Sequence, residues 1–81
     1  MKLPRDLSGA KLARALSRYG YQITRQSGSH MRLTSSYKGT QHHITIPAHT
    51  PLKIGTLSQI LADVAGYLEF ARDQLAKELF A

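Results

Sequence analysis

The stretch Gly28-Ser29-His30-Met31-Arg32 separates two alternating segments and decides how the middle of the chain folds. Apolar and polar side chains alternate over residues 21–26 before the glycine and again over residues 30–34 after it. A period of two is typical of half-buried β-strands, and the Ser-Gly-Ser between the segments is typical of a turn. A third alternating segment covers residues 42–46, after another polar turn. Connections this short predict a three-stranded antiparallel meander.

The alternation also assigns side chains to the two faces of the predicted sheet. On the face beneath the helices, we expect Ile23, Leu33, Ile44 and Ile46. The opposite face is then open and polar, and it displays Gln22, Thr24, His30, Arg32, His43 and Thr45. A substrate can therefore reach His30, Arg32 and His43 on one solvent-facing surface.

Helical patterns flank the strands on both sides. A helix from Ser8 repeats apolar residues at spacings of three and four, with Ser8 as its N-cap and Gly20 at its left-handed end. A second helix is expected to begin at the capping box Thr56-Leu57-Ser58-Gln59, with Thr56 as N-cap. Gly66 is expected to end it, although an interior glycine costs only about 1 kcal/mol and leaves a continuous helix open. Residues 67–80 carry a last helical pattern, and the order of elements predicts an α+β fold.

Positive charge is concentrated in the first part of the chain. Residues 1–53 contain nine lysines and arginines and one aspartate, a net +8, whereas residues 54–81 contain two basic and four acidic residues, a net −2. The total of +6 favours polyanionic partners. Lys11, Arg14 and Arg18 form a stripe at positions i, i+3 and i+7 of the first helix, which is either a solvated face or a phosphate-contacting face.

Composition disfavours several classes of protein. The chain has no cysteine, which excludes disulfides and thiolate metal sites and is compatible with a reducing cytosol. It lacks the roughly 20 consecutive apolar residues that span a bilayer, and its charged start is unlike a signal peptide. His42 and His43 are neighbours, but adjacent strand residues point to opposite faces and few acidic residues accompany them. We therefore expect a cytoplasmic protein with no membrane segment, no metal and no other cofactor.

Four motifs together resemble the HicA family of toxin mRNA interferases. They are Gly28-Ser29-His30, the strand Ile44-Thr45-Ile46-Pro47, His49, and Gly55-Thr56-Leu57-x-x-Ile60-Leu61-x-x-Val64-Ala65-Gly66. The resemblance is strongest over residues 9–66 of a single domain, residues 1–81, and leaves residues 67–81 as a C-terminal helical extension. It implies a fold similar to that of a double-stranded-RNA-binding domain, with the helices on one side of the sheet.

The resemblance also implies a function. It implies the toxin of a toxin–antitoxin system, an endoribonuclease that cleaves mRNA without a metal ion and has His30 as its catalytic histidine. The implied partner is a HicB-type antitoxin, with the toxin monomeric alone and hetero-oligomeric with the antitoxin. Family members often carry a second histidine or another polar residue directly after the catalytic one, and here Met31 takes that position. Since residue 31 points to the predicted core, this departure is tolerable.

Cleavage of RNA without a metal needs a base for the 2′-hydroxyl proton, an acid for the leaving 5′-oxygen and positive charge near the phosphorus. A histidine, with an ordinary pKa of about 6.5, can serve as either group. We predict His30 as base or acid, and Arg32 and Lys53 as stabilisers of the developing charge. Gly28 and Ser29 form the turn that orients His30. The other predicted RNA contacts or supports are Lys11, Arg14, Arg18, His43, His49 and Thr56.

The sequence leaves the second proton-transfer group open. His43 shares the predicted face with His30, whereas His49 lies in the loop before a helix whose N-terminus can hold a phosphate. Each of these two histidines is alternatively a surface residue or an RNA contact.

Two other functions fit the same residues. A non-catalytic RNA-binding module would use the basic helix and the loop at Lys53 to recognise the shape of the RNA. A protein-interaction domain would instead dock an acidic partner on the same basic surface.

Overall fold

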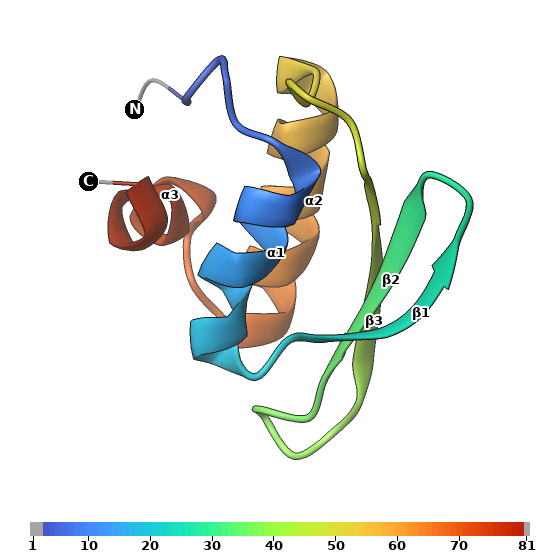
Figure 1. Ribbon diagram of the computed structural model, residues 1–81. Helices are drawn as coiled ribbons and strands as arrows, with labels where there is room; N and C mark the ends of the chain where they lie inside the picture. Colours follow the sequence, from blue (N-terminus) through green and yellow to red (C-terminus); the bar gives the residue numbers. More distant parts are fainter. Residues whose placement is uncertain (1–2, 81) are drawn as a thin grey trace.

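The computed structural model describes residues 3–80, and it places a sheet beside two layers of helices (Figure 1). In chain order the elements are α1 (Gly9–Leu16), a short 3-10 helix (Ser17–Tyr19), β1 (Gln22–Ser27), β2 (His30–Ser35), β3 (His42–Pro47), α2 (Ile54–Leu68) and α3 (Arg72–Phe80). The three strands are antiparallel in the order β1-β2-β3. Helices α1 and α2 cover one face of the sheet, and α3 lies beyond them (Figure 1). The predicted α+β arrangement is confirmed.

The core lies between the sheet and the α1–α2 layer. Its most deeply buried side chains come from α1, from the residue before β1, from the inner face of the sheet and from one stripe of α2: Leu12, Leu16, Tyr21, Leu33, Ile46, Leu57, Leu61 and Val64. The α2 members recur at i, i+4 and i+7, the spacing of one helix face. Leu75 anchors α3 to the same core. Met31 is also buried, as predicted, so its place after His30 is a packing position.

The predicted N-cap of the first helix and the left-handed Gly20 are confirmed, although the α-helix ends at Leu16 and a 3-10 helix continues to Tyr19. The Ser8 hydroxyl accepts a hydrogen bond from the backbone N–H of Lys11 at 3.1 Å, which satisfies one of the free donors at the start of α1. Gly20 ends the 3-10 helix with φ of +81°, in the left-handed region that glycine adopts without strain. The chain can therefore reverse into β1 directly.

Strand β1 departs from the predicted alternation at a bulge. The register with β2 shifts between Ile23 and Arg25, so Thr24 is an extra residue on the bulged strand. The prediction that Ile23 is a core residue is wrong, because its side chain is 51% exposed. The strand lies at the edge of the sheet, and the small side chains of Ala10 and Ala13 leave a groove between α1 and β1 that keeps Ile23 open to solvent.

Helix α2 begins earlier than the predicted capping box. Lys53 is the N-cap, with extended backbone and no side-chain cap, and Thr56 is the third residue of the helix. The prediction of Thr56 as N-cap is therefore wrong. The buried Leu52, whose N–H donates to the Leu7 carbonyl at 2.8 Å, ends the loop at that point, and the chain turns into the helix directly after it.

Helix α2 also ends later than predicted. It passes through Gly66 to Leu68, and the residue that ends it is Glu69, with φ of +63°. Burial of Ala65 and Leu68 outweighs the cost of about 1 kcal/mol for a glycine inside a helix. The last helix consequently starts at Arg72 and not at residue 67.

Within residues 3–80, no helix is both long enough and apolar enough to cross a membrane. The predicted domain limits at residues 1 and 81 lie outside the described residues.

Candidate functional site

The face of the sheet opposite the helices is exposed and polar. The inner positions of β2 and β3 are buried, except for the partly buried His42 at the start of β3, and the outer positions are exposed or partly exposed. His30, Arg32 and His43 therefore share the open face, which agrees with the prediction from the alternating pattern. The side chains brought to this face are Thr24, Arg25, Ser27, His30, Arg32, Thr34, His43 and Thr45.

His30 is the first residue of β2, directly after a tight turn. Gly28 has φ of +57° and the turn contains only two residues, the pattern of a type II′ hairpin with glycine first. The Ser29 carbonyl accepts a hydrogen bond from Ala48 N–H at 2.6 Å, which ties the turn to the chain that leaves β3. Across the sheet His30 is paired with Ser27 and Pro47. The turn thus positions His30 through its backbone, and no side chain within residues 3–80 hydrogen-bonds the imidazole.

Arg32 is two residues from His30 on the same face, and Arg25 is its partner on β1. Strict alternation would have put Arg25 on the inner face, so the sequence pattern did not predict its outward position. The bulge at Thr24 shifts the register by one residue and turns Arg25 outward. Like charges directly opposite each other on a sheet are destabilising, so this pair favours a bound anion. Nothing in the local sequence marks the bulge.

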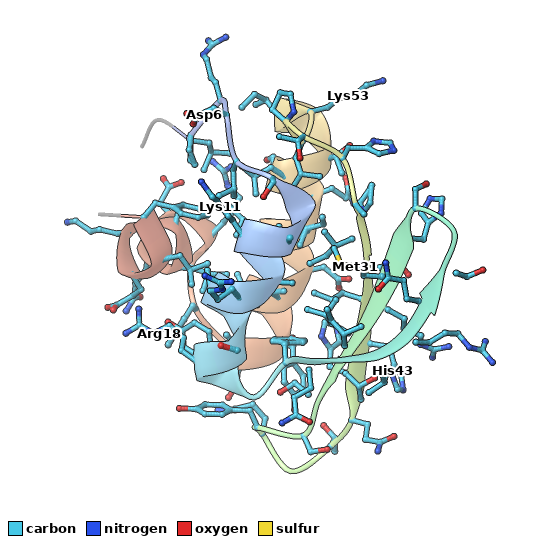
Figure 2. The ribbon with its side chains drawn as sticks, viewed as in Figure 1. Asp6, Lys11, Arg18, Met31, His43 and Lys53 are labelled. Atoms are coloured by element: carbon cyan, nitrogen blue, oxygen red, sulfur yellow. The ribbon has the colours of Figure 1, made fainter. Side chains whose placement is uncertain are left out.

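His43 is held by a hydrogen-bond chain and lies far from His30. Its Nδ1 is 2.8 Å from the Thr34 hydroxyl, which is 2.9 Å from the Thr24 hydroxyl. His43 is paired with Thr34, four residues from His30 along β2, a separation of about 13 Å at 3.3 Å per residue. The two imidazoles therefore cannot both act on one phosphorus, although they share a face (Figure 2 labels His43).

His42 points to the inner side, as the alternation predicts, and it is built into the core edge. Its Nδ1 is 2.7 Å from the Tyr21 hydroxyl, its Nε2 is 3.3 Å from Asp63, and its ring stacks on Tyr67. Burial raises the pKa of Tyr21 well above its usual value. No local sequence pattern predicts this network, since it joins residues that are distant in the chain. Across residues 3–80, no group of three histidine, cysteine, aspartate or glutamate side chains gathers that could hold a metal ion.

A groove of about 400 Å³ runs between β3 and the first turns of α2. It is lined by Thr45, Pro47, Gly55, Thr56, Gln59 and Ile60. Because Pro47 is the strand partner of His30, the groove adjoins the turn that carries the histidine. Lys53 projects at the same end of the molecule (Figure 2). His49 lies in the intervening loop, where its carbonyl accepts the Gly9 N–H at 3.0 Å and its side chain is exposed.

The basic stripe of α1 is not part of the open face, because it belongs to the helix layer. Figure 2 shows Lys11 and Arg18 on the far side of the molecule from His43. The Arg18 guanidinium donates to the Glu78 carbonyl of α3 at 2.8 Å and lies over the Tyr19 ring. Arg14 lines the groove between α1 and β1. The structure thus brings His30, Arg32 and Arg25 together and leaves the predicted stripe elsewhere.

Comparison with known proteins supports one assignment. A family model for the HicA toxin of bacterial toxin–antitoxin systems matches residues 9–65, which is more than half of the chain. The searches of curated proteins and of solved structures gave no match. The matched region contains the hairpin with His30, the whole sheet, the loop at His49 and most of α2. The chain therefore belongs to the HicA family, and it is the toxin of a toxin–antitoxin pair.

Proposed function

We propose that this toxin is an endoribonuclease that cleaves mRNA through the imidazole of His30, without a metal ion. In the proposed reaction the 2′-oxygen attacks the adjacent phosphorus and the bond from phosphorus to the 5′-oxygen breaks. The products end in a 2′,3′-cyclic phosphate and a 5′-hydroxyl. One proton leaves the 2′-hydroxyl and one reaches the 5′-oxygen, and His30 carries one of these two transfers.

The observation that carries this proposal is the position of His30 on an exposed face, where it lies two residues along β2 from Arg32, the partner of Arg25. An imidazole that no side chain within residues 3–80 hydrogen-bonds is free to bind a ribose or phosphate oxygen. Guanidinium groups present a planar fork of donors that matches phosphate oxygens, and their charge stabilises the phosphorane. A proton-transfer group and its electrostatic support therefore lie on the same surface.

The groove between β3 and α2 offers the RNA backbone a path away from His30. Lys53 stands at the start of α2, and the positive end of the helix dipole adds to its charge. We assign Lys53, Thr56 and His49 as contacts to the RNA backbone on this side. Lys11 and Arg14 contribute to RNA binding at longer range, through the overall positive charge. The Arg18 guanidinium instead donates a hydrogen bond to the Glu78 carbonyl.

We further propose that a HicB-type antitoxin neutralises the toxin by covering the face that carries His30. The net charge of +6 favours an acidic surface on that partner. The toxin is proposed to be a monomer alone and a hetero-oligomer with its antitoxin.

The test is cleavage of a mixed-sequence RNA in EDTA by the purified toxin, by His30→Ala and by Gln74→Ala. Gln74 is exposed on α3, away from the open face, and serves as the matched control. We expect the wild type and Gln74→Ala to cut the RNA and to leave cyclic or 3′-phosphate ends. His30→Ala should lose at least a hundredfold in rate, as expected when a general acid or base is removed. Circular dichroism verifies that all three proteins are folded.

A non-catalytic RNA-binding module would give a different result. In that case the wild type and His30→Ala would bind the RNA equally and neither would cut it. Cleavage that EDTA abolishes would contradict the metal-independent reaction and leave the RNA-binding surface in place.

A further inference from the structure

A chain of hydrogen bonds crosses all three strands on the open face, and the proposed cleavage does not use it. The Thr24 hydroxyl of β1 donates to the Arg32 carbonyl at 3.4 Å and lies 2.9 Å from the Thr34 hydroxyl of β2. The Thr34 hydroxyl in turn lies 2.8 Å from Nδ1 of His43 on β3. The chain therefore ends at an exposed imidazole.

The order of donors in this chain decides which nitrogen of His43 carries the hydrogen. All three contacts can be hydrogen bonds at once only if the single hydrogen of the Thr24 hydroxyl points to the Arg32 carbonyl, which can only accept. Thr34 must then donate its own hydrogen to Thr24. The Thr34 oxygen is left to accept, and Nδ1 of His43 is the donor that reaches it. In the neutral ring Nε2 consequently has no hydrogen and acts as an acceptor.

His43 is exposed, and nothing within residues 3–80 hydrogen-bonds its Nε2. Within the sugar–phosphate backbone of RNA, a phosphate oxygen cannot donate to such an acceptor, whereas the 2′-hydroxyl of a ribose can. His43 lies about 13 Å from His30 along the sheet, so any ribose it binds belongs to a nucleotide away from the cut. Arg32 lies between the two histidines on the same face and can hold the intervening backbone.

From this geometry we propose that His43, oriented by Thr34 and Thr24, accepts a hydrogen bond from one 2′-hydroxyl of the substrate away from the scissile phosphate. The inference rests on RNA being the substrate. The site adds selectivity for RNA over DNA at a nucleotide where no chemistry occurs. Thr34 and Thr24 are positioning residues, because they act through the ring of His43.

The experiment uses a short RNA with a 2′-deoxy nucleotide at the cleavage point, which blocks the reaction. A series of these probes carries one additional 2′-deoxy substitution at each neighbouring position in turn. Affinity is measured by fluorescence anisotropy for the wild type, His43→Leu, Thr34→Val and Thr40→Val. Thr40→Val makes the same chemical change in the exposed β2–β3 turn, outside the hydrogen-bond chain, and is the matched control.

We expect the wild type and Thr40→Val to lose roughly threefold to tenfold in affinity when one particular 2′-hydroxyl is removed, which corresponds to one hydrogen bond. His43→Leu and Thr34→Val should bind that probe and its parent equally. The proposal would be overturned if His43→Leu lost affinity at the same 2′-deoxy position as the wild type. It would also be overturned if the affinity of the wild type fell at no position. In either case the three hydroxyl and imidazole groups serve only to join the strands.

The results separate this inference from the nuclease itself. If the wild type cuts RNA but His43→Leu leaves the profile unchanged, the inference fails and the proposed nuclease stands. If the profile appears but no RNA is ever cut, the inference stands and the proposed nuclease fails. A wild type that binds no RNA contradicts both.

Discussion

Gly9 lies where α1 meets the chain that leaves β3, and the carbonyl of Pro47 occupies the space that a side chain would need. A Cβ at this position would collide with the Pro47 carbonyl oxygen and would lie 3.3 Å from Cα of Ala48. Because these are backbone atoms, they cannot swing aside as a long side chain does. This close approach places the start of α1 against Pro47, which is the last residue of β3 and the strand partner of His30.

Replacing Gly9 by alanine should therefore destabilise the protein by about 1–3 kcal/mol, the usual cost of forcing extra volume into a packed site. The control is Gly66→Ala, since Gly66 lies inside α2, where an added methyl group would meet no neighbour within 4 Å. That change should stabilise the protein by about 0.5–1 kcal/mol. Urea unfolding measures both, and shifts of the same sign would contradict this account of Gly9.

Arg25 and Arg32 offer a second prediction for single residues. Replacing Arg32 by glutamine should lower kcat/KM for RNA about tenfold to a hundredfold, and Arg25→Gln should lower it less, since Arg25 lies one strand further from His30. Arg25→Gln should also raise stability slightly, because it removes a like-charge pair. Kinetics on RNA and thermal unfolding check the two effects. If neither substitution changed the rate of cleavage, a role of the two arginines in the site would be contradicted.

Both ends of helix α2 depart from the usual capping pattern. It starts at Ile54 without a side-chain cap, next to the groove beside His30, and it ends at Glu69 in the left-handed conformation. Phe70 N–H donates to the Ala65 carbonyl at 2.9 Å, the 6→1 bond of a Schellman motif. Glycine is the usual residue at such an end, so the glutamate is strained there.

Glu69→Gly should accordingly stabilise the protein by about 1 kcal/mol. The substitution also breaks the ion pair of Glu69 with Lys38 at 3.0 Å, but the glutamate is 76% exposed and the pair contributes little. Glu69→Gln separates the two effects, since it removes the charge and keeps the side chain. We expect a change below about 0.5 kcal/mol for Glu69→Gln in chemical unfolding. A larger loss there would show that the ion pair matters more than the backbone conformation.

At the scale of the whole molecule, a network of four side chains joins the residue before β1, the start of β3 and the second half of α2: Tyr21, His42, Asp63 and Tyr67. Tyr21 is only 1% exposed, and burial raises its pKa. Burial also raises the pKa of Tyr19. Both phenols stay protonated in the folded chain at a pH where they ionise in the unfolded chain.

This difference gives stability a definite dependence on alkaline pH. Above pH 10, the usual pKa of tyrosine, the unfolded chain binds fewer protons than the folded chain, so the free energy of unfolding falls as pH rises. Below pH 10 the contribution is fully present. In Tyr21→Phe the free energy of unfolding should fall less steeply above pH 10, and the remaining fall should be the one that Tyr19 causes. The measurement is the free energy of unfolding of the wild type and of Tyr21→Phe at pH 8 to 11. If the two free energies fell in parallel as pH rises, a role for Tyr21 would be contradicted.

The open face and its histidines could be predicted from the sequence because side-chain direction in a strand follows a local period of two. His30, Arg32, His43 and the inward Met31 all obey it. Arg25 could not be predicted, since a bulge depends on how β1 meets β2 and α1 and leaves no local pattern. The basic stripe of α1 was visible in the sequence, but its distance from the sheet face was not.

The sequence by itself determined the types of the elements, their order, the turn before His30 and the concentration of positive charge, because these follow from neighbouring residues. Only the tertiary structure decided the outward position of Arg25, the capping residues of α2, which are Lys53 and Glu69, and the exposure of Ile23. Each of these depends on packing between segments distant in the chain, and such packing outweighs local preferences of about 1 kcal/mol.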